Sequence, residues 1–188
     1  MAAHEDPPPS AAARELDAKL RRALREDRVA TVRRLLRREG FPIALRDAQG
    51  WAPLHAAALR GQSDMVDLLL DAGADIDART HDGGTPLECA AWGGRVETVR
   101  RLIASGAALP EAGPRALGTA VRKGHVAVVD ALLDAGVEPD ALIDEQTALT
   151  FAIERAQLEI AARLLERGAD PRGRGRGSPL VAAIQRDA

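Results

Sequence analysis

The stretch GWAPLHAAALRG, residues 50–61, occurs again thirty-three residues later as GGTPLECAAWGG, residues 83–94. The two copies share both outer glycines, a Pro-Leu pair near the start and an Ala-Ala pair in the middle. The segment that follows, DMVDLLLDAGA at 64–74, aligns without a gap on ETVRRLIASGA at 97–107. Self-similarity at a fixed period of this length is the sequence signature of stacked repeats, so we predict a repeat array.

Further copies follow this pair. GHVAVVDALLDAG at 124–136 matches residues 94–106 at an offset of thirty, so three residues are missing from the connection before Ala116. A fourth unit opens at Thr147, and a fifth opens at Ser178. The array therefore extends almost to the end of the sequence.

The pattern predicts one continuous domain without a second core. Upstream of the first full copy, the apolar periodicity is that of a short antiparallel helix pair without the Pro-Leu opening, and terminal repeats are often atypical in this way. We expect a disordered tail at 1–13 and a single domain at 14–188, made of a terminal helix pair at 14–46, repeats at about 47–79, 80–109, 110–141 and 142–172, and a partial C-terminal repeat at 173–188.

Composition limits the class of protein. Of the 188 residues, 46% are hydrophobic but only 2% are aromatic, which suits thin, closely stacked helices. The net charge of −2 gives no overall field that would attract nucleic acid. The single cysteine, Cys89, excludes an internal disulfide framework and fits a reducing compartment. Because the N-terminus lacks the pattern of a secretory signal and no apolar run approaches the ~18 residues of a spanning helix, we expect a cytoplasmic protein without a membrane partner.

The segment WAPLHAAALRGQSDMVDLLLDAGADIDA resembles an ankyrin repeat, whose family has a Thr-Pro-Leu-His-x-Ala signature and a period of 33 residues. The resemblance covers about residues 14–188. It implies an all-α fold, an ankyrin-repeat solenoid of stacked antiparallel helix pairs with short β-hairpin-like loops. The chain departs from the family pattern at Ala52, Glu88, Arg115-Ala116 and Ala156, where the family has Thr, His, Thr-Pro and the turn glycine. These departures bear on local hairpin geometry.

Proline and glycine stand where such helix pairs need them. Pro53 and Pro86 suit the first turn of a helix, where the missing N–H has no intrahelical partner. We expect tight turns within the pairs at Gly61, Gly94 and Gly124. Left-handed residues are expected to end the second helices, at Gly73, Gly106, Gly136 and Gly168.

Two histidines are predicted to be structural. In ankyrin repeats the histidine at the position of His55 closes the start of the first helix, and one that follows the turn glycine, as His125 does, ties neighbouring repeats. On this interpretation His55→Ala costs about 1–2 kcal/mol of stability. The four histidines and Cys89 have no metal-ligand spacing, so we predict no metal site.

The motifs of an active site are missing from the sequence. The GRGRG segment at 173–177 has no preceding apolar strand and no Gly-Lys-Ser/Thr ending, so it is not a phosphate loop. There is no Gly-x-Ser-x-Gly nucleophile turn. We therefore predict that the protein is not an enzyme and has no cofactor, and a small enzyme is the least favoured interpretation.

Basic residues gather at the two ends of the array. Residues 14–46 carry eleven Lys or Arg against five acids, and Arg172, Arg174 and Arg176 add a second cluster. Such clusters can contact phosphates, so a nucleic-acid-associated regulator is the alternative function. Against it, residues 47–79 carry six acids and two bases, which interrupts a basic stripe.

The favoured function is a monomeric, non-catalytic module for protein–protein interaction. In the family, hairpin tips and first helices form a concave surface that binds a protein partner. The resemblance places on this surface Trp51, Leu59, Arg60, His81, Trp92, Arg122, Lys123, Glu154, Arg155 and, in the partial repeat, Gln185 and Arg186.

The two tryptophans give the sharpest hypothesis about this surface. Stacking of successive repeats should bring Trp51 near Trp92, where the rings either form a binding site or cover neighbouring alanines. Because the rest of the core holds almost no aromatic rings, we favour the binding site. A basic wall beside the rings, which favours a partner with an acidic surface and an apolar centre, is expected from Arg60, Arg122, Lys123 and Arg155.

The partial repeat at the C-terminus is expected to be a weakly held edge. Leu180, Ala183 and Ile184 can pack on the fourth repeat, but no second helix follows to cover them. We expect fast exchange of amide hydrogens after about Gly173, unless a partner covers this edge.

Overall fold

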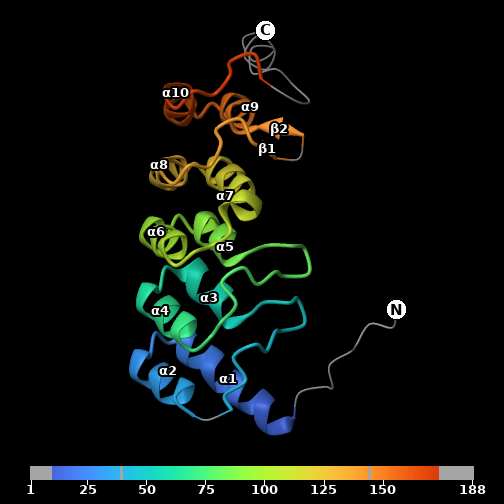
Figure 1. Ribbon diagram of the computed structural model, residues 1–188, viewed down its shortest axis with the longest axis vertical. Coiled ribbons are helices and arrows are strands. Elements are labelled where there is room, and N and C mark those ends of the chain that lie inside the picture. Colours follow the sequence, from blue (N-terminus) through green and yellow to red (C-terminus); the bar gives the residue numbers. More distant parts are fainter. Residues whose placement is uncertain (1–9, 39, 144, 174–188) are drawn as a thin grey trace, which may run out of the picture.

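Pairs of antiparallel helices follow one another along the chain. The computed structural model describes residues 10–38, 40–143 and 145–173, and within them it has ten helices. The first helices of the pairs are α1 (Ala11–Arg25), α3 (Pro53–Arg60), α5 (Pro86–Trp92), α7 (Leu109–Lys123) and α9 (Ala148–Glu154). The second helices are α2 (Val29–Leu36), α4 (Ser63–Asp71), α6 (Val96–Ala104), α8 (Val126–Asp134) and α10 (Leu158–Glu166). Figure 1 shows the first helices stacked in one column and the second helices in another.

Left-handed residues make the turns within and after the pairs. Gly61, between α3 and α4, has φ of +75°, and Gly124, between α7 and α8, has φ of +74°. Glycine enters this region without strain, whereas Ala156 holds φ of +58° between α9 and α10 with a Cβ in place. The prediction for the ends of the second helices is confirmed, since φ lies between +86° and +93° at Gly73, Gly106, Gly136 and Gly168.

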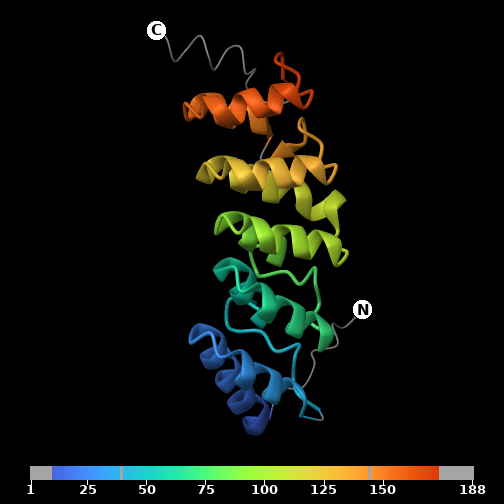
Figure 2. The ribbon, with the colours of Figure 1, turned by 90° about the vertical axis from the view of Figure 1, so that its left-hand side faces the viewer.

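One continuous apolar core runs through the stack. The first helices contribute leucines from a single repeat position, each at most 1% exposed, namely Leu20, Leu54, Leu87, Leu117 and Leu149. The second helices contribute equivalent leucines that are 0% exposed, namely Leu69, Leu102, Leu132 and Leu164. Each fully buried leucine stabilises the fold by about 1.5–3 kcal/mol. In Figure 2 the pairs lie one above another along a single axis, which confirms the predicted array.

Polar side chains tie each pair to the one before it. The residue after the left-handed turn reaches back to a carbonyl oxygen near the end of the preceding first helix. The contacts join Gln62 Nε2 to the Leu24 oxygen at 2.7 Å, Arg95 Nε to the Leu59 oxygen at 3.1 Å, and His125 Nε2 to the Trp92 oxygen at 3.1 Å. Because the last carbonyl groups of a helix have no intrahelical partner, these side chains satisfy them across the interface.

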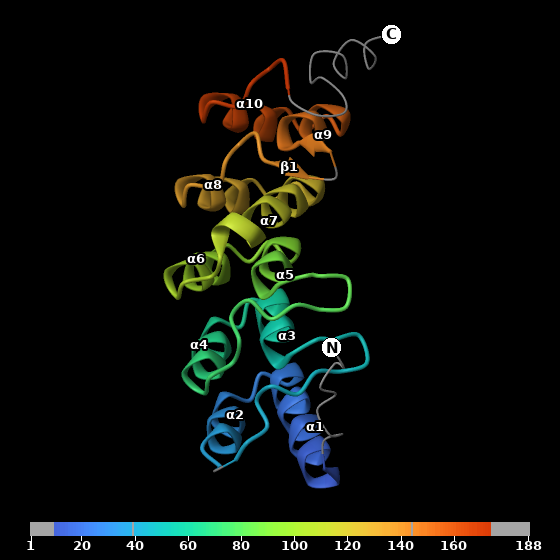
Figure 3. The same ribbon diagram turned by 45° about the vertical axis from the view of Figure 1, so that its right-hand side comes forward.

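Hairpin-like loops connect most pairs. The loops before α3 and α5 project on the same side of the stack, beside the first helices (Figure 3). Backbone hydrogen bonds close them, from Asp47 N–H to the Trp51 oxygen at 3.0 Å and from Thr80 N–H to the Gly84 oxygen at 2.9 Å. Before α9 the loop is a two-stranded hairpin, in which β1 (Leu142–Ile143) pairs antiparallel with β2 (Gln146–Thr147).

The connection before α7 differs from the predicted hairpin. Helix α7 begins at Leu109, which we placed at the end of the second repeat, and it runs for 15 residues with Pro114 inside it. Because three residues are missing, the chain is too short to extend outward and return, and it coils into additional helical turns instead. Asp77 secures the start of α7 by accepting the Ala108 N–H at 3.0 Å. The fold class is confirmed, and at this one connection a helix replaces the hairpin.

The first helix begins earlier than expected. We predicted a disordered tail up to residue 13, but α1 starts at Ala11 because the Ser10 hydroxyl caps it, accepting the Ala13 N–H at 3.1 Å. The predicted fifth opening and the groove residues Gln185 and Arg186 lie outside the described residues. Within the described part of the chain, no helix is long and apolar enough to cross a membrane.

Candidate binding groove

A groove of about 420 Å³ joins the first repeat to the second on the side of the first helices. Its walls come from the loop that leads into α3, the end of α3, the hairpin between α4 and α5, and α5 itself. The lining residues are Trp51, Leu59, Thr80, Asp82, Gly84, Glu88, Cys89 and Trp92.

Trp51 is held in the groove by its backbone and by a ring contact. Its N–H donates to the Asp47 carboxylate at 2.8 Å, and its carbonyl oxygen accepts from the Arg21 guanidinium at 2.9 Å. The indole lies 5.7 Å, centroid to centroid, from the imidazole of His55 at a tilt of 50°. These contacts fix the position of a half-buried ring that also lines the groove.

Trp92 is the last residue of α5 and is 53% exposed. The Lys123 ammonium lies 3.4 Å from the centroid of its ring, a cation–π contact that orients the indole. Leu59, the equivalent residue of the first repeat, is half-buried and adds apolar surface to the same groove. The structure therefore brings Trp51, Leu59 and Trp92 to one groove.

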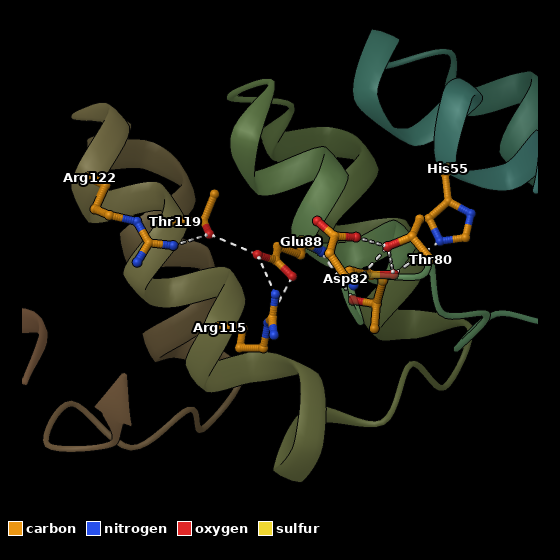
Figure 4. A network of polar contacts seen from close by, with 9 residues as sticks. His55, Thr80, Asp82, Glu88, Arg115, Thr119 and Arg122 are labelled. Carbon is orange, nitrogen blue, oxygen red and sulfur yellow. Dashed lines mark hydrogen bonds and ion pairs between the residues drawn. The ribbon is translucent and has the colours of Figure 1, made fainter. Parts of the chain in front are cut away.

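Two carboxylates, Asp82 and Glu88, line the groove with the rings. Figure 4 shows the polar contacts of these two side chains. Asp82 accepts a hydrogen bond from the Thr80 hydroxyl, and this bond lowers the pKa of the Asp82 carboxyl below its usual value. Glu88 pairs with the Arg115 guanidinium at 3.1 Å and accepts a hydrogen bond from the Thr119 hydroxyl at 3.2 Å. Both side chains therefore bring negative charge to the groove at neutral pH.

His55 is fully buried behind this lining. Its Nδ1 accepts the Ala52 N–H at 3.1 Å, at the start of α3, and its Nε2 lies 3.2 Å from the Gly84 oxygen in the next hairpin. Since Nδ1 accepts, Nε2 carries the proton and donates to that oxygen. Burial lowers the pKa of His55, which favours this neutral form. These contacts fit the structural role that we predict for the residue.

The other predicted groove residues lie outside the lining. Arg60 donates to the Ala56 oxygen at 3.3 Å, the Arg122 guanidinium lies 5.7 Å from the centroid of the Phe151 ring, and Lys123 contacts Trp92 from repeat three. Three further predicted residues are exposed and do not line the groove, namely His81, Glu154 and Arg155. Of the expected basic wall, Lys123 lies beside the Trp92 ring, and none of its four residues is among those that line the groove.

Sequence reasoning missed the polar half of the groove, Thr80, Asp82 and Glu88. One signal was available, because Glu88 replaces the histidine of the family signature. The other two lie in a hairpin whose placement over α5 depends on packing between repeats.

The groove also contains the one cysteine of the chain, Cys89, which is buried. Burial raises the pKa of the Cys89 thiol to about 12, so the sulfur stays protonated and is a poor nucleophile at neutral pH. Among the described residues, no group of three or more His, Cys, Asp or Glu could hold a metal ion.

Comparison with known proteins assigns the fold to a family. A family model of ankyrin repeats in three copies matches residues 20–112 and 108–175. These matches cover most of the chain, and the chain belongs to the ankyrin repeat family. Ankyrin repeats generally mediate protein–protein interaction and are typically non-catalytic.

Three known proteins share a shorter segment with this chain. Ankyrin repeat domain-containing protein 49 of Homo sapiens is 44% identical over 58 residues, which is 31% of this chain and 24% of that protein. Delta-latroinsectotoxin-Lt1a of Latrodectus tredecimguttatus is 41% identical over 58 residues, 31% of this chain and 5% of the toxin. The 2-5A-dependent ribonuclease of Mus musculus is 41% identical over 61 residues, 32% of this chain and 8% of the enzyme. The chain spans no more than 24% of the length of these relatives.

Proposed function

We propose that the protein is a non-catalytic interaction module that binds a segment of a protein partner in the groove between repeats one and two. One observation carries this proposal, namely that Trp51 and Trp92, from successive repeats, line a single groove together with Leu59. Tryptophan is the residue type most enriched among binding hot spots, where truncation costs ~2 kcal/mol or more.

The rigidity of the groove supports the same proposal. Trp51 is fixed by Asp47, Arg21 and His55, and Trp92 by Lys123, before any partner is bound. A side chain that is already ordered loses little conformational entropy on binding, so more of the contact energy appears as affinity. The two rings therefore suit a preformed binding surface better than a passive cover.

The test is truncation of each ring, measured on a peptide ligand selected from a random-peptide library with the wild-type chain. Trp51→Ala and Trp92→Ala should each weaken binding by more than about tenfold, or ~1.4 kcal/mol, and lower the melting temperature little. Leu158→Ala is the matched control, because Leu158 is an apolar side chain that is 71% exposed on α10, outside the groove. Normal binding by both tryptophan variants, or unfolding of both, would contradict the proposal.

A second candidate function is binding of nucleic acid by α2. Arg33, Arg34 and Arg37 line a concavity of about 470 Å³ with Val29 and Ala30. Within the described part of the chain, none of these arginines has an ion pair with a carboxylate. Binding of this kind predicts a gel shift that weakens steeply with salt and is lost when the three arginines are changed to glutamine.

We also propose a cytoplasmic, monomeric protein. A single cysteine with a buried thiol is what a reducing compartment allows. Sedimentation of the purified chain tests the monomeric state, and imaging of a tagged chain in the source cell tests the location.

A further inference from the structure

The charge of the groove is opposite to the charge expected from the sequence. Its eight lining residues, all within the described part of the chain, include two carboxylates and no lysine or arginine. A partner with an acidic surface, which the expected basic wall favours, would bring like charges together here. Like-charge contacts across an interface are unfavourable and select against such partners.

The nearby basic side chains already have contacts of their own. Lys123 lies over the Trp92 ring, and Arg115 is paired with Glu88. Arg122 donates to the Thr119 hydroxyl at 3.1 Å. Glu88 therefore offsets the charge of Arg115, whereas Lys123 contacts a ring and Arg122 a hydroxyl, and none of the three lines the groove.

Asp82 is the carboxylate available to a ligand. It is exposed, it accepts its hydrogen bond from the neutral Thr80 hydroxyl, and among the described residues no cation lies within ion-pair distance of it. The Arg115 guanidinium, which is paired with Glu88, attracts the Asp82 carboxylate from farther away and contributes less than the Thr80 bond to the lowered pKa of Asp82. Glu88, with a side chain that is 16% exposed, adds a second and partly compensated charge deeper in the groove.

The rings beside these carboxylates also suit a cation. Indole faces attract ammonium and guanidinium groups, and the Lys123 ammonium at 3.4 Å from the Trp92 centroid shows this within the protein. Lysine and arginine side chains have long aliphatic stems that pack on apolar surface while the charged end meets a polar group. Apolar walls with carboxylates beside them match both parts of such a side chain.

We propose that the groove accepts a lysine or arginine side chain of the partner, with its stem against Trp51, Leu59 and the part of Trp92 that Lys123 leaves exposed, and its charged end against Asp82 and Glu88. This inference rests on the proposed function, because it specifies the chemistry of a ligand for the same groove.

The experiment is a selection from an unbiased random-peptide library, carried out in parallel on the wild-type chain and on a folded Trp51→Ala/Trp92→Ala variant. Peptides that bind only the wild type are expected to share a lysine or arginine at one position. Replacement of that residue by glutamine in the synthetic peptide should weaken binding by about tenfold, because it removes the attraction to both carboxylates. Exchange of lysine for arginine shows which cation is preferred.

Removal of the charge of Asp82 tests the protein side of the contact. Asp82→Asn retains an oxygen that can accept the Thr80 hydrogen bond, and it should weaken the selected peptide by about threefold at low salt and less at high salt. Asp71→Asn is the matched control, since Asp71 is an exposed carboxylate at the end of α4 outside the groove, and it should leave binding unchanged.

The outcomes separate this inference from the proposed function. Suppose that peptides bind the wild type but not the Trp51→Ala/Trp92→Ala variant, and that they are acidic or share no lysine or arginine. This result overturns the inference and leaves the proposed function standing. Equal binding to wild type and Asp82→Asn, or equal losses in the Asp82→Asn and Asp71→Asn variants, also overturns it. If the wild-type chain selects no tryptophan-dependent peptide, the proposed function fails and the inference fails with it.

Discussion

The interface between repeats one and two and the interface between repeats two and three use different polar contacts at the same repeat position. In the first, His55 reaches across to the Gly84 oxygen in the next hairpin at 3.2 Å. In the second, Glu88 pairs with Arg115 and accepts from Thr119, both on α7. The difference follows from the missing residues before α7. Without a hairpin there is no loop carbonyl for a histidine to meet, and the added helical turns supply an arginine instead.

The next interface extends this comparison. At the same repeat position the third repeat has Gly118, which is buried, and a Cβ built there would lie 2.8 Å from the Cγ2 atom of Ile143 in β1. The contact across this interface is therefore apolar packing. The residue at each such position is matched to what the following connection presents, which is a carbonyl, a cation or a methyl group.

Substitution of Gly118 by histidine, the residue of the family signature, should have the largest effect on stability. Gly118→His places an imidazole where even a methyl group meets Ile143, so we expect a loss of about 3 kcal/mol in the free energy of unfolding, by urea titration. Gly118→Ala is the milder companion and should lose clearly less. A stable Gly118→His variant would show that the hairpin before α9 moves to make room, and the comparison would fail at this interface.

Removal of His55, which contacts the next hairpin across the first interface, should have the second-largest effect on stability. His55→Ala leaves the buried Ala52 N–H without its partner, removes one hydrogen bond to the Gly84 oxygen, which keeps the Thr80 N–H at 2.9 Å, and opens a cavity. We therefore expect a loss of about 2 kcal/mol in the free energy of unfolding, within the range expected from the sequence. Glu88→Ala is the control at the equivalent position and should lose less, because its ion pair with Arg115 is partly exposed and screened. Equal losses would mean that the two interfaces do not differ in this respect.

Substitution of Glu88 by histidine replaces the residue used at the second interface by the one used at the first. This change should have a smaller effect on stability. Glu88→His removes the pair with Arg115 and the acceptor of the Thr119 hydroxyl, and no hairpin carbonyl replaces them, so we expect a loss of about 1 kcal/mol by thermal or urea unfolding. A gain in stability would show that histidine finds an acceptor on α7 and that the missing hairpin is not the reason for glutamate here.

The left-handed turns inside the helix pairs offer a second comparison, in which the expected changes in stability are of similar size. Ala156→Gly should raise stability by about 1 kcal/mol, because glycine relieves the strain of φ at +58°. Gly124→Ala at the equivalent turn should lower stability by a similar amount. The added Cβ would lie 3.5 Å from the Gln157 side chain, an ordinary contact, so the loss comes from the left-handed backbone and not from a clash. Changes of the same sign in both variants would contradict this assignment of strain.

A fall in pH should reduce the contribution that His55, at the interface between repeats one and two, makes to the free energy of unfolding. Burial lowers the pKa of His55 below its usual 6.5, so the unfolded chain takes up the proton first as pH falls through that value. The stability from neutral His55 is therefore complete above about pH 6.5 and is progressively lost below it. The difference in unfolding free energy between wild type and His55→Ala should narrow from pH 7 to pH 5, whereas Glu88→Ala, which keeps His55, should follow the wild type. A difference that does not change with pH would rule out this linkage.

The sequence by itself determined the repeat register, the helix pairs and the core. Leu54 and Leu87 occupy equivalent positions in the buried row, and Gly73 and Gly106 take the left-handed conformation, because these features depend on short-range signals that recur with the repeat. The sequence also placed Trp51 and Trp92 on one surface, since stacking in register brings equivalent elements together.

Only the tertiary structure decided how the connections pack and what charge the groove carries. The helical start of α7 depends on the length left by a deletion and on Asp77 from the preceding repeat, which meets the Ala108 N–H at 3.0 Å. The acidic groove depends on how the hairpin that holds Asp82 lies over α5, and on Lys123, which contacts the Trp92 ring from repeat three. The contacts of Asp77 with Ala108 and of Lys123 with Trp92 join residues about thirty positions apart, so their geometry is set by packing between repeats and not by any local pattern.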